Sequence, residues 1–122
     1  MNNSRPYRVL VVEDEALISM LLEDMLKECG FEVVGAITRL EEALALIACE
    51  KIDIGLLDIN LGDGTVYPVA DAMHAQRIPF IFSTGYSACA LPPRFEDRVT
   101  LQKPFSAQDL RHTLLKSLPN RP

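Results

Sequence analysis

A run of four uninterrupted apolar residues, Val9-Leu10-Val11-Val12, constrains the fold more than any other feature of the sequence. A strand whose sheet has one solvent-facing side alternates apolar and polar residues, whereas a continuously apolar strand is typical of a parallel sheet buried on both faces. Four further short apolar segments follow, and helical patterns separate them. The sequence therefore predicts an α/β fold with a five-stranded parallel sheet built from βα units.

Turn and capping signals set the expected limits of these elements. We expect strands at about 7–13, 32–36, 54–58, 80–83 and 99–101, and helices that begin near residues 15, 39, 68, 86 and 107. Thr38 and Glu41 have the spacing of a capping box, as do Ser106 and Asp109. Residues 60–64 are expected to form a loop, and Pro92-Pro93 should leave the fourth helix short or irregular.

The first predicted helix carries two adjacent apolar stripes. Such stripes normally face a core, and Gly30 is placed to end the helix. The residues are Leu17, Leu21 and Met25 in one stripe and Ile18, Leu22 and Leu26 in the other.

Size and charge bound what the chain can do. Its 122 residues suit one domain, with a core at about 7–118 and no output domain. The formal net charge of −5 argues against direct nucleic-acid binding. There is no apolar run of about 20 residues to insert into a membrane, and the N-terminus lacks a signal peptide. We therefore expect a cytoplasmic protein.

Charged and hydroxyl side chains follow the predicted strands. Glu13-Asp14 follow the first strand, Asp58 ends the third, Thr84 ends the fourth, and Lys103 follows the fifth. The carboxyl ends of parallel strands lie on one edge of the sheet, where ligands bind. We expect these side chains to converge there.

Three carboxylates beside one ammonium group need an additional cation. Carboxylate oxygens suit Mg²⁺, which keeps open coordination positions for water or phosphate oxygens. The pattern thus predicts a magnesium site at which a phosphoryl group binds. Asp58 is the expected nucleophile, because an aspartate can form an aspartyl phosphate and Glu13 and Asp14 are placed as a metal clamp. Thr84 and Lys103 are expected to contact the phosphoryl group.

The set Glu13-Asp14, Asp58, Thr84-Gly85 and Lys103-Pro104-Phe105 resembles the receiver domain of two-component response regulators. The resemblance implies a flavodoxin-like, doubly wound (βα)5 fold with strand order 2-1-3-4-5 and a cis peptide bond before Pro104. It implies phosphotransfer from a sensor histidine kinase to Asp58. It also implies a Mg²⁺ site formed by Glu13, Asp14, Asp58 and the backbone carbonyl of Asn60.

One departure from the family pattern concerns the expected switch and output surface, which comprises Tyr86, Thr100 and Phe105. Many receivers have an aromatic residue three positions before the lysine, where this chain has Thr100. The segment Phe82-Ser83-Thr84-Gly85-Tyr86 instead resembles single-domain regulators with a Phe-Ala/Ser-Thr-Gly-Tyr signature. Tyr86 is a candidate to replace the missing aromatic group.

Several functions stay open at this stage. The resemblance implies binding to an unknown downstream protein or draining of phosphate from a shared kinase, and leaves homodimer formation open. A metal-dependent phosphatase is disfavoured because such enzymes usually place Asp-x-Asp after the first strand, where this chain has Glu13-Asp14-Glu15. A flavodoxin-like cofactor protein is disfavoured by the anionic first loop. A pseudo-receiver, which would be used only for docking, is disfavoured because the acidic, hydroxyl and lysine residues of the family are all present.

Overall fold

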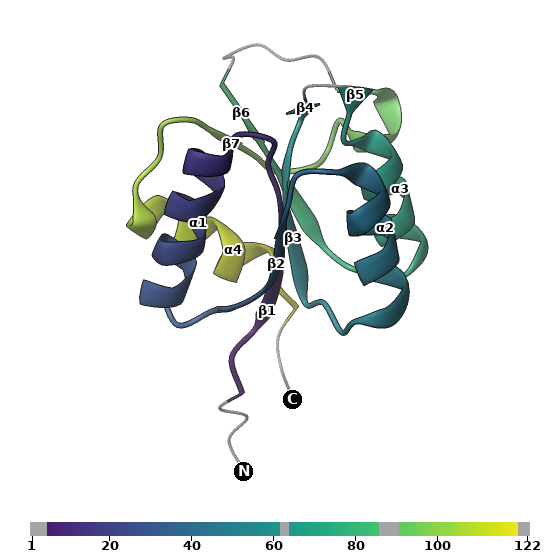
Figure 1. Ribbon diagram of the computed structural model, residues 1–122. Coiled ribbons are helices and arrows are strands. Elements are labelled where there is room, and N and C mark those ends of the chain that lie inside the picture. Colours follow the sequence, from purple (N-terminus) through teal and green to yellow (C-terminus); the bar gives the residue numbers. More distant parts are fainter. Residues whose placement is uncertain (1–4, 62–63, 86–90, 120–122) are drawn as a thin grey trace.

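The computed structural model describes residues 5–61, 64–85 and 91–119, and its centre is a five-stranded parallel sheet with the order β2-β1-β3-β6-β7. Helices α1 and α4 cover one face of this sheet, and α2 and α3 cover the other (Figure 1). A two-stranded antiparallel hairpin, β4-β5, follows β3. Counted along the chain, the five strands of this sheet have the order 2-1-3-4-5, so the expected α/β fold and strand order are confirmed. The elements are β1 (Arg8–Val12), α1 (Ala16–Glu28), β2 (Glu32–Ile37), α2 (Leu40–Cys49), β3 (Ile54–Asp58), β4 (Asn60–Leu61), β5 (Gly64–Thr65), α3 (Tyr67–Ala75), β6 (Phe80–Thr84), the 3-10 turn η1 (Pro93–Phe95), β7 (Thr100–Gln102) and α4 (Ala107–Ser117).

The continuous apolar run in β1 is explained by two cores, one on each face of the sheet. Leu10 and Val12 pack in the core beneath α2 and α3. Val9 and Val11 point the other way, into the core beneath α1 and α4. Successive side chains of a strand point to opposite faces, so a strand covered on both sides needs an apolar residue at every position. All four are at most 1% exposed.

The start of α2 differs from the sequence prediction. Strand β2 continues to Ile37, and α2 begins only at Leu40. Arg39, in an extended conformation, therefore takes the N-cap position without a side-chain cap, and the predicted capping box of Thr38 and Glu41 is wrong. The second capping box is confirmed: Ser106 Oγ accepts a hydrogen bond from the backbone N–H of Asp109 at 3.0 Å.

Helix α1 is correctly placed, but two residues of one of its apolar stripes are exposed to solvent. Leu22 and Leu26 are buried in the core, whereas Leu17 is 81% and Leu21 61% exposed. Met25, in the same stripe as Leu17 and Leu21, packs against the core, so this stripe is only partly buried. The apolar arc of this helix is wider than the surface the sheet and α4 can cover.

In the segment expected to hold a short fourth helix, the described residues form only the 3-10 turn η1. The Phe95 ring is 1% exposed and packs at 5.6 to 5.8 Å, between ring centroids, against Phe80, Phe82 and Tyr67. The Arg94 guanidinium makes two hydrogen bonds, of 2.8 and 3.0 Å, to the Asp71 carboxylate on α3. These contacts hold residues 93–95 against α3.

Two smaller features complete the path of the chain to the sheet edge. The predicted loop at 60–64 contains part of the short hairpin β4-β5, in which Asn60 pairs with Thr65. The Lys103–Pro104 peptide bond is cis, as the family resemblance implied. Within the described residues, no helix is both long and apolar enough to cross a membrane.

Candidate functional site

Four of the predicted site residues meet at the carboxyl edge of the sheet because each follows or ends a parallel strand. Glu13 comes directly after β1, Asp58 is the last residue of β3, Thr84 is the last residue of β6, and Lys103 comes directly after β7. Strands β1, β3 and β6 are adjacent in the sheet, so their ends are neighbours although the residues are far apart in the sequence. The convergence predicted from the strand ends is present in the structure.

The Lys103 ammonium group joins the two buried carboxylates of the site. Its Nζ lies 2.7 Å from Glu13 Oε1 and 3.3 Å from Asp58 Oδ2. A backbone hydrogen bond of 2.8 Å from Lys103 N–H to the Thr84 carbonyl oxygen holds the lysine next to β6. The lysine side chain is 21% exposed, so it is not fully enclosed by the protein.

The three carboxylates form a compact group of possible metal ligands. One oxygen each from Glu13, Asp14 and Asp58 lies within 4.8 Å of the other two. Glu13 is 1% exposed and Asp58 6% exposed, whereas Asp14 lies nearer the surface. Three hard oxygen donors that open toward solvent on one side match what Mg²⁺ takes from a protein, since this ion keeps several waters or substrate oxygens.

The electrostatics of the site show that its negative charge is not balanced. Burial, and next the negative charge of Glu13, raise the pKa of Asp58 to about 6, against the opposing effect of Lys103. For Lys103, burial lowers the pKa, but the hydrogen bond to Glu13 and the charge of Asp58 outweigh burial and raise it. The ammonium group is thus held in its charged form, and the carboxylates still repel one another. A second cation would relieve this repulsion.

The positions of Thr84 and Asn60 are compatible with their predicted roles. Ser83 pairs with Asp58 across the sheet, so Thr84 lies one residue beyond the nucleophile candidate on the neighbouring strand. Thr84 is 3% exposed. Asn60 is two residues after Asp58 and begins β4, so its backbone lies close in the sequence to the nucleophile candidate.

The predicted output surface is only partly described by the structure. Thr100 opens β7 and is exposed. Phe105 is half-buried and packs against the core beneath α1 and α4. Tyr86 lies outside the described residues, so its proposed replacement of the missing aromatic group stays a prediction.

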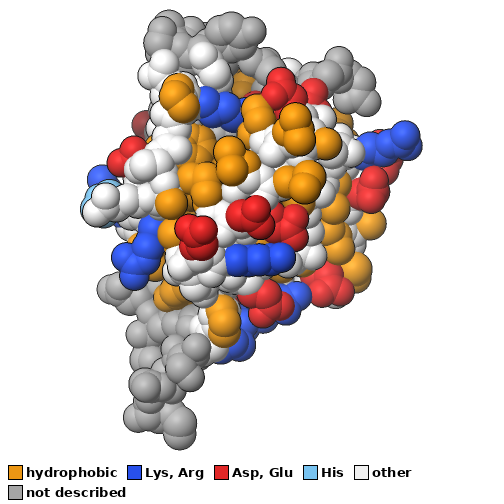
Figure 2. Space-filling model, turned by 60° about the vertical axis from the view of Figure 1, so that its left-hand side comes forward, with side chains coloured by type: hydrophobic (Ala, Val, Ile, Leu, Met, Phe, Trp, Pro, Cys, Tyr) orange, Lys and Arg blue, Asp and Glu red, His pale blue; other side chains and the backbone are white. Residues whose placement is uncertain are grey.

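An apolar surface on α1 lies next to the acidic site and was missed by the sequence analysis. Its exposed members, which we call the α1 surface, are Leu17, Met20 and Leu21, which are between 61% and 81% exposed. Figure 2, which turns the α1 side forward, shows hydrophobic side chains gathered on this face. The signal was an apolar arc in residues 17–26 too wide for one buried stripe.

A cavity connects this surface with the site lysine. It has a volume of about 170 Å³ and an almost entirely apolar lining. Lys103, Pro104 and Phe105 form one side of it, and Ile18, Leu21, Leu22 and Met25 of α1 form the other.

Comparison with known protein families and curated proteins identifies related sequences. The response regulator receiver domain family matches residues 9–115. The transcriptional regulatory protein PdtaR of Mycobacterium tuberculosis is 38% identical over 109 residues, which cover 86% of this chain and 53% of PdtaR. The sensory transduction protein LytT of Bacillus anthracis is 32% identical over 113 residues, or 89% of this chain and 46% of LytT. The chain spans about half the length of these curated relatives.

Solved structures with the same fold include chains of similar length. The solution structure of SdrG from Sphingomonas melonis Fr1 has a TM-score of 0.80 and 40% identity, and covers 93% of this chain and 97% of SdrG. SdrG in its BeF3-activated conformation has a TM-score of 0.77 and 42% identity, with coverage of 88% and 92%. The receiver domain of PhyR from Erythrobacter litoralis has a TM-score of 0.83 and 30% identity, with coverage of 96% and 95%.

Proposed function

Because the chain belongs to the response regulator receiver domain family, we propose that it is a signalling module controlled by phosphorylation of Asp58. The observation that carries this proposal is the position of Asp58 at the end of the central strand β3, with Glu13 and Asp14 on one side and the Lys103 ammonium 3.3 Å away. Phosphoryl transfer needs mainly positioning and charge neutralisation. The carboxyl edge provides a nucleophile and a fixed cation.

The acidic cluster fits a Mg²⁺ ion, because its donors are hard oxygens and its charge exceeds that of Lys103. Glu13, Asp14, Asp58 and the backbone carbonyl of Asn60 would hold the ion, which would neutralise charge between the Asp58 carboxylate and the phosphoryl oxygens. This ligand set is our proposal.

In the proposed reaction a carboxylate oxygen of Asp58 attacks phosphorus. The P–N bond of a phosphohistidine on a sensor histidine kinase breaks, its electron pair stays on the imidazole nitrogen, and an acyl phosphate forms on Asp58. The Lys103 ammonium, already placed beside Asp58, donates a hydrogen bond to a phosphoryl oxygen. Thr84, one residue beyond the residue opposite Asp58, donates a second from its hydroxyl group.

The α1 surface provides a place for the phosphodonor to dock. Leu17, Met20 and Leu21 expose apolar side chains, and the adjoining cavity is lined by Lys103 itself. A donor that covers these side chains approaches the carboxyl edge from the α1 side. Exposed apolar patches of this kind mark protein interaction sites on soluble domains. We propose that the kinase presents a complementary apolar surface here.

We propose that phosphorylation changes binding to a downstream protein or a second copy of the chain through the surface that includes Tyr86, Thr100 and Phe105. The domain would also serve as a phosphate sink when no downstream protein binds.

The test is the intact mass of the protein after incubation with acetyl phosphate, with and without Mg²⁺. We expect a Mg²⁺-dependent gain of one phosphoryl group that is lost in Asp58→Asn and kept in Asp24→Asn, an exposed aspartate on α1 that serves as the matched control. A gain that persists in Asp58→Asn would contradict the assignment of the phosphoacceptor. A gain that is independent of Mg²⁺ would contradict the metal site.

A further inference from the structure

A groove at the amino edge of the sheet, opposite the acidic site, is not used by the proposed phosphotransfer. It consists of two adjoining cavities of about 480 and 240 Å³, which share Pro79, Arg98 and Ser117 and which we call the amino-edge groove. Its walls come from the end of α3, the residues that enter β6 and β7, and the end of α4. The larger cavity is within the size range of small-molecule sites.

The charged side chains that line the amino-edge groove are mostly cationic, although the whole chain has a net charge of −5. Among the described lining residues, Arg77, Arg98 and Lys116 carry positive charges and Asp97 carries a negative charge. Helices α3 and α4 end here, and each carboxyl end contributes about half a negative charge. Three full positive charges exceed Asp97 and these helix ends together, so the groove attracts anions.

Arg77 and Lys116 have no ion-pair partner among the described residues, which end at residue 119. Arg98 is fixed differently: its guanidinium lies 4.2 Å over the Phe80 ring and contacts His74 Nδ1 at 2.9 Å. Arginine has no acceptor, so His74 Nδ1 accepts that hydrogen bond. The remaining ring nitrogen is then the one that carries hydrogen and can donate.

A buried hydroxyl group in the groove also lacks a partner among the residues that the structure describes. Ser117 Oγ is buried and has no hydrogen-bond partner within 5–61, 64–85 and 91–119, and Ser117 lines both cavities. A buried hydroxyl without a partner costs free energy. A ligand oxygen that enters the groove would accept this hydrogen bond and remove the cost.

The amino-edge groove also offers apolar contact. Ile78, Pro79, Leu118 and Pro119 line the larger cavity, whose exposed surface is mostly apolar. We propose that the groove binds a small organic anion, with a phosphate or carboxylate group between Arg77, Arg98 and Lys116 and an apolar part against Ile78 and Leu118. Phosphate and carboxylate are the groups that guanidinium side chains recognise.

The test is a titration of ¹⁵N-labelled protein followed by NMR, in EDTA and at constant ionic strength. The probes are phenyl phosphate, benzoate and inorganic phosphate, with sodium chloride as the reference anion. We expect saturable shifts at the amides of Ile78, Arg98 and Leu118, and tighter binding of an aromatic anion than of inorganic phosphate. Whichever of phenyl phosphate and benzoate binds more tightly identifies the preferred anionic group. Shifts that do not saturate, or that chloride reproduces, would overturn the proposal.

Matched variants separate a binding role from general electrostatics. We expect Arg77→Gln and Lys116→Gln each to weaken binding of the preferred aromatic anion by roughly fivefold. Arg39→Gln, which removes an exposed cation near the start of α2 at the opposite edge, is expected to leave binding unchanged. Equal weakening in all three variants, or no weakening in any of them, would contradict a site in the groove.

Ser117→Ala distinguishes a ligand-binding hydroxyl from a structural one. If the hydroxyl serves the ligand, the variant binds roughly threefold more weakly while its melting temperature is unchanged or higher, because an unpartnered buried hydroxyl is removed. A lower melting temperature with unchanged binding would assign the hydroxyl a structural role and overturn its part in the site. None of these outcomes depends on Asp58, so failure here leaves the proposed phosphotransfer intact.

Discussion

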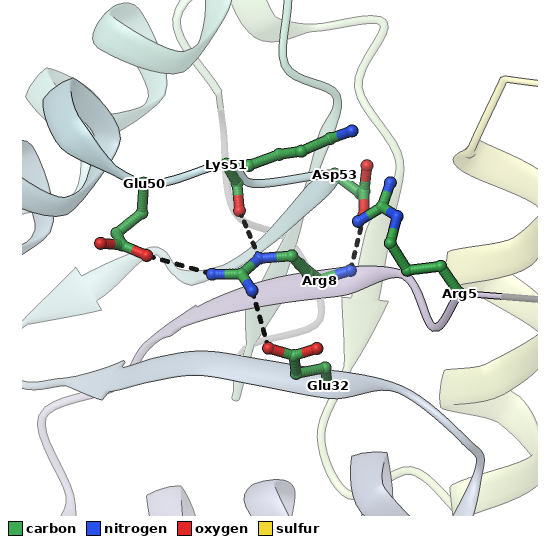
Figure 3. Close-up of polar contacts among 6 residues, drawn as sticks. All are labelled: Arg5, Arg8, Glu32, Glu50, Lys51 and Asp53. Carbon is green, nitrogen blue, oxygen red and sulfur yellow. Dashed lines mark hydrogen bonds and ion pairs between the residues drawn. The ribbon is translucent and has the colours of Figure 1, made fainter.

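Strand β1 has a charged cluster at each end, and the two clusters balance their charges differently. At the amino end, the Arg8 guanidinium lies 2.7 Å from Glu32 and 3.1 Å from Glu50, and it donates a 2.8 Å hydrogen bond to the Lys51 carbonyl (Figure 3). Asp53 accepts a 2.7 Å hydrogen bond from the Arg8 backbone N–H. All three guanidinium nitrogens therefore have partners, and the partners come from β2 and from the chain leading to β3.

At the carboxyl end, one ammonium group contacts two buried carboxylates while a third lies beside them. Lys103 contacts Glu13 and Asp58, and Asp14 completes the group. The pKa of Asp58 is raised to about 6, first by burial and then by Glu13. At the amino end every guanidinium nitrogen is paired, which stabilises the fold. At the carboxyl end the buried excess of negative charge does not stabilise the folded protein. The difference indicates a structural role for the amino end and supports our proposal that the carboxyl end is a binding site.

The largest expected effect is the loss of the site lysine. Lys103→Met leaves Glu13 and Asp58 buried without a cation, which should lower the free energy of unfolding by about 3 kcal/mol in Mg²⁺-free buffer. Lys103→Arg keeps the charge and should retain most of the stability. Urea denaturation of both variants measures the difference, and a loss below about 1 kcal/mol in Lys103→Met would show that the lysine does not balance the cluster.

The corresponding substitution at the other end of β1 should cost less. Arg8→Met removes three side-chain hydrogen bonds, but Glu32 and Glu50 are partly exposed and regain water. We expect a decrease of about 2 kcal/mol in the free energy of unfolding, which Mg²⁺ does not restore. Recovery of the Arg8→Met stability by Mg²⁺ would contradict the separation of the two clusters.

Removal of one carboxylate should change the free energy of unfolding in opposite directions at the two ends of β1. In Mg²⁺-free buffer at pH 7, Asp58→Asn removes a carboxylate whose ionised form is disfavoured in the folded protein, so the free energy of unfolding should increase by about 1 kcal/mol. Asp53→Asn removes a carboxylate that accepts a hydrogen bond from Arg8 and should decrease it by about 1 kcal/mol.

The pH dependence of this gain follows from the raised pKa of Asp58. The folded protein resists ionisation of this carboxyl, so the destabilisation is present above a pH of about 6 and shrinks as the pH falls toward the ordinary carboxyl value of 3.8. Chemical denaturation at pH 7 and at pH 5 should therefore show a smaller gain for Asp58→Asn at the lower pH. Destabilisation by Asp58→Asn at both pH values would contradict an excess of negative charge at the carboxyl end of β1.

The smallest expected effect is stabilisation by Mg²⁺. A ligand that binds only the folded state adds about 0.4 kcal/mol at a free concentration equal to its Kd. We expect this gain in the natural protein and in Arg39→Gln, and its loss in Asp14→Asn. Thermal denaturation at several Mg²⁺ concentrations measures it, and an equal gain in Asp14→Asn would place the bound ion elsewhere.

The strand-end rule explains why much of the site could be predicted. Once Val9-Leu10-Val11-Val12 indicates a buried parallel strand, the polar residues after each strand must meet at one edge, and the positions of Glu13, Asp58 and Lys103 follow from the fold. The capping box at Ser106 was predictable for a similar reason, since it is a local hydrogen-bond pattern within four residues.

Features that depend on distant surfaces could not be predicted. The periodicity of α1 shows which side chains share a face, but not whether another element covers that face, so the exposure of Leu17 and Met20 was missed. The pairing of Arg94 with Asp71 joins residues 23 positions apart and depends on η1 packing against α3. Even the start of α2 depended on how far β2 continues beside β1.

The central claim is that the carboxyl end of β1 and its neighbours bind Mg²⁺ and a phosphoryl group at Asp58. The most direct measurement is an NMR titration of ¹⁵N-labelled protein with beryllofluoride, a phosphoryl mimic, in the presence of Mg²⁺. The account predicts saturable changes at the amides of Asp58, Thr84 and Lys103, which are absent in Asp58→Asn and without Mg²⁺. No change in the natural protein, or the same changes in Asp58→Asn, would contradict it.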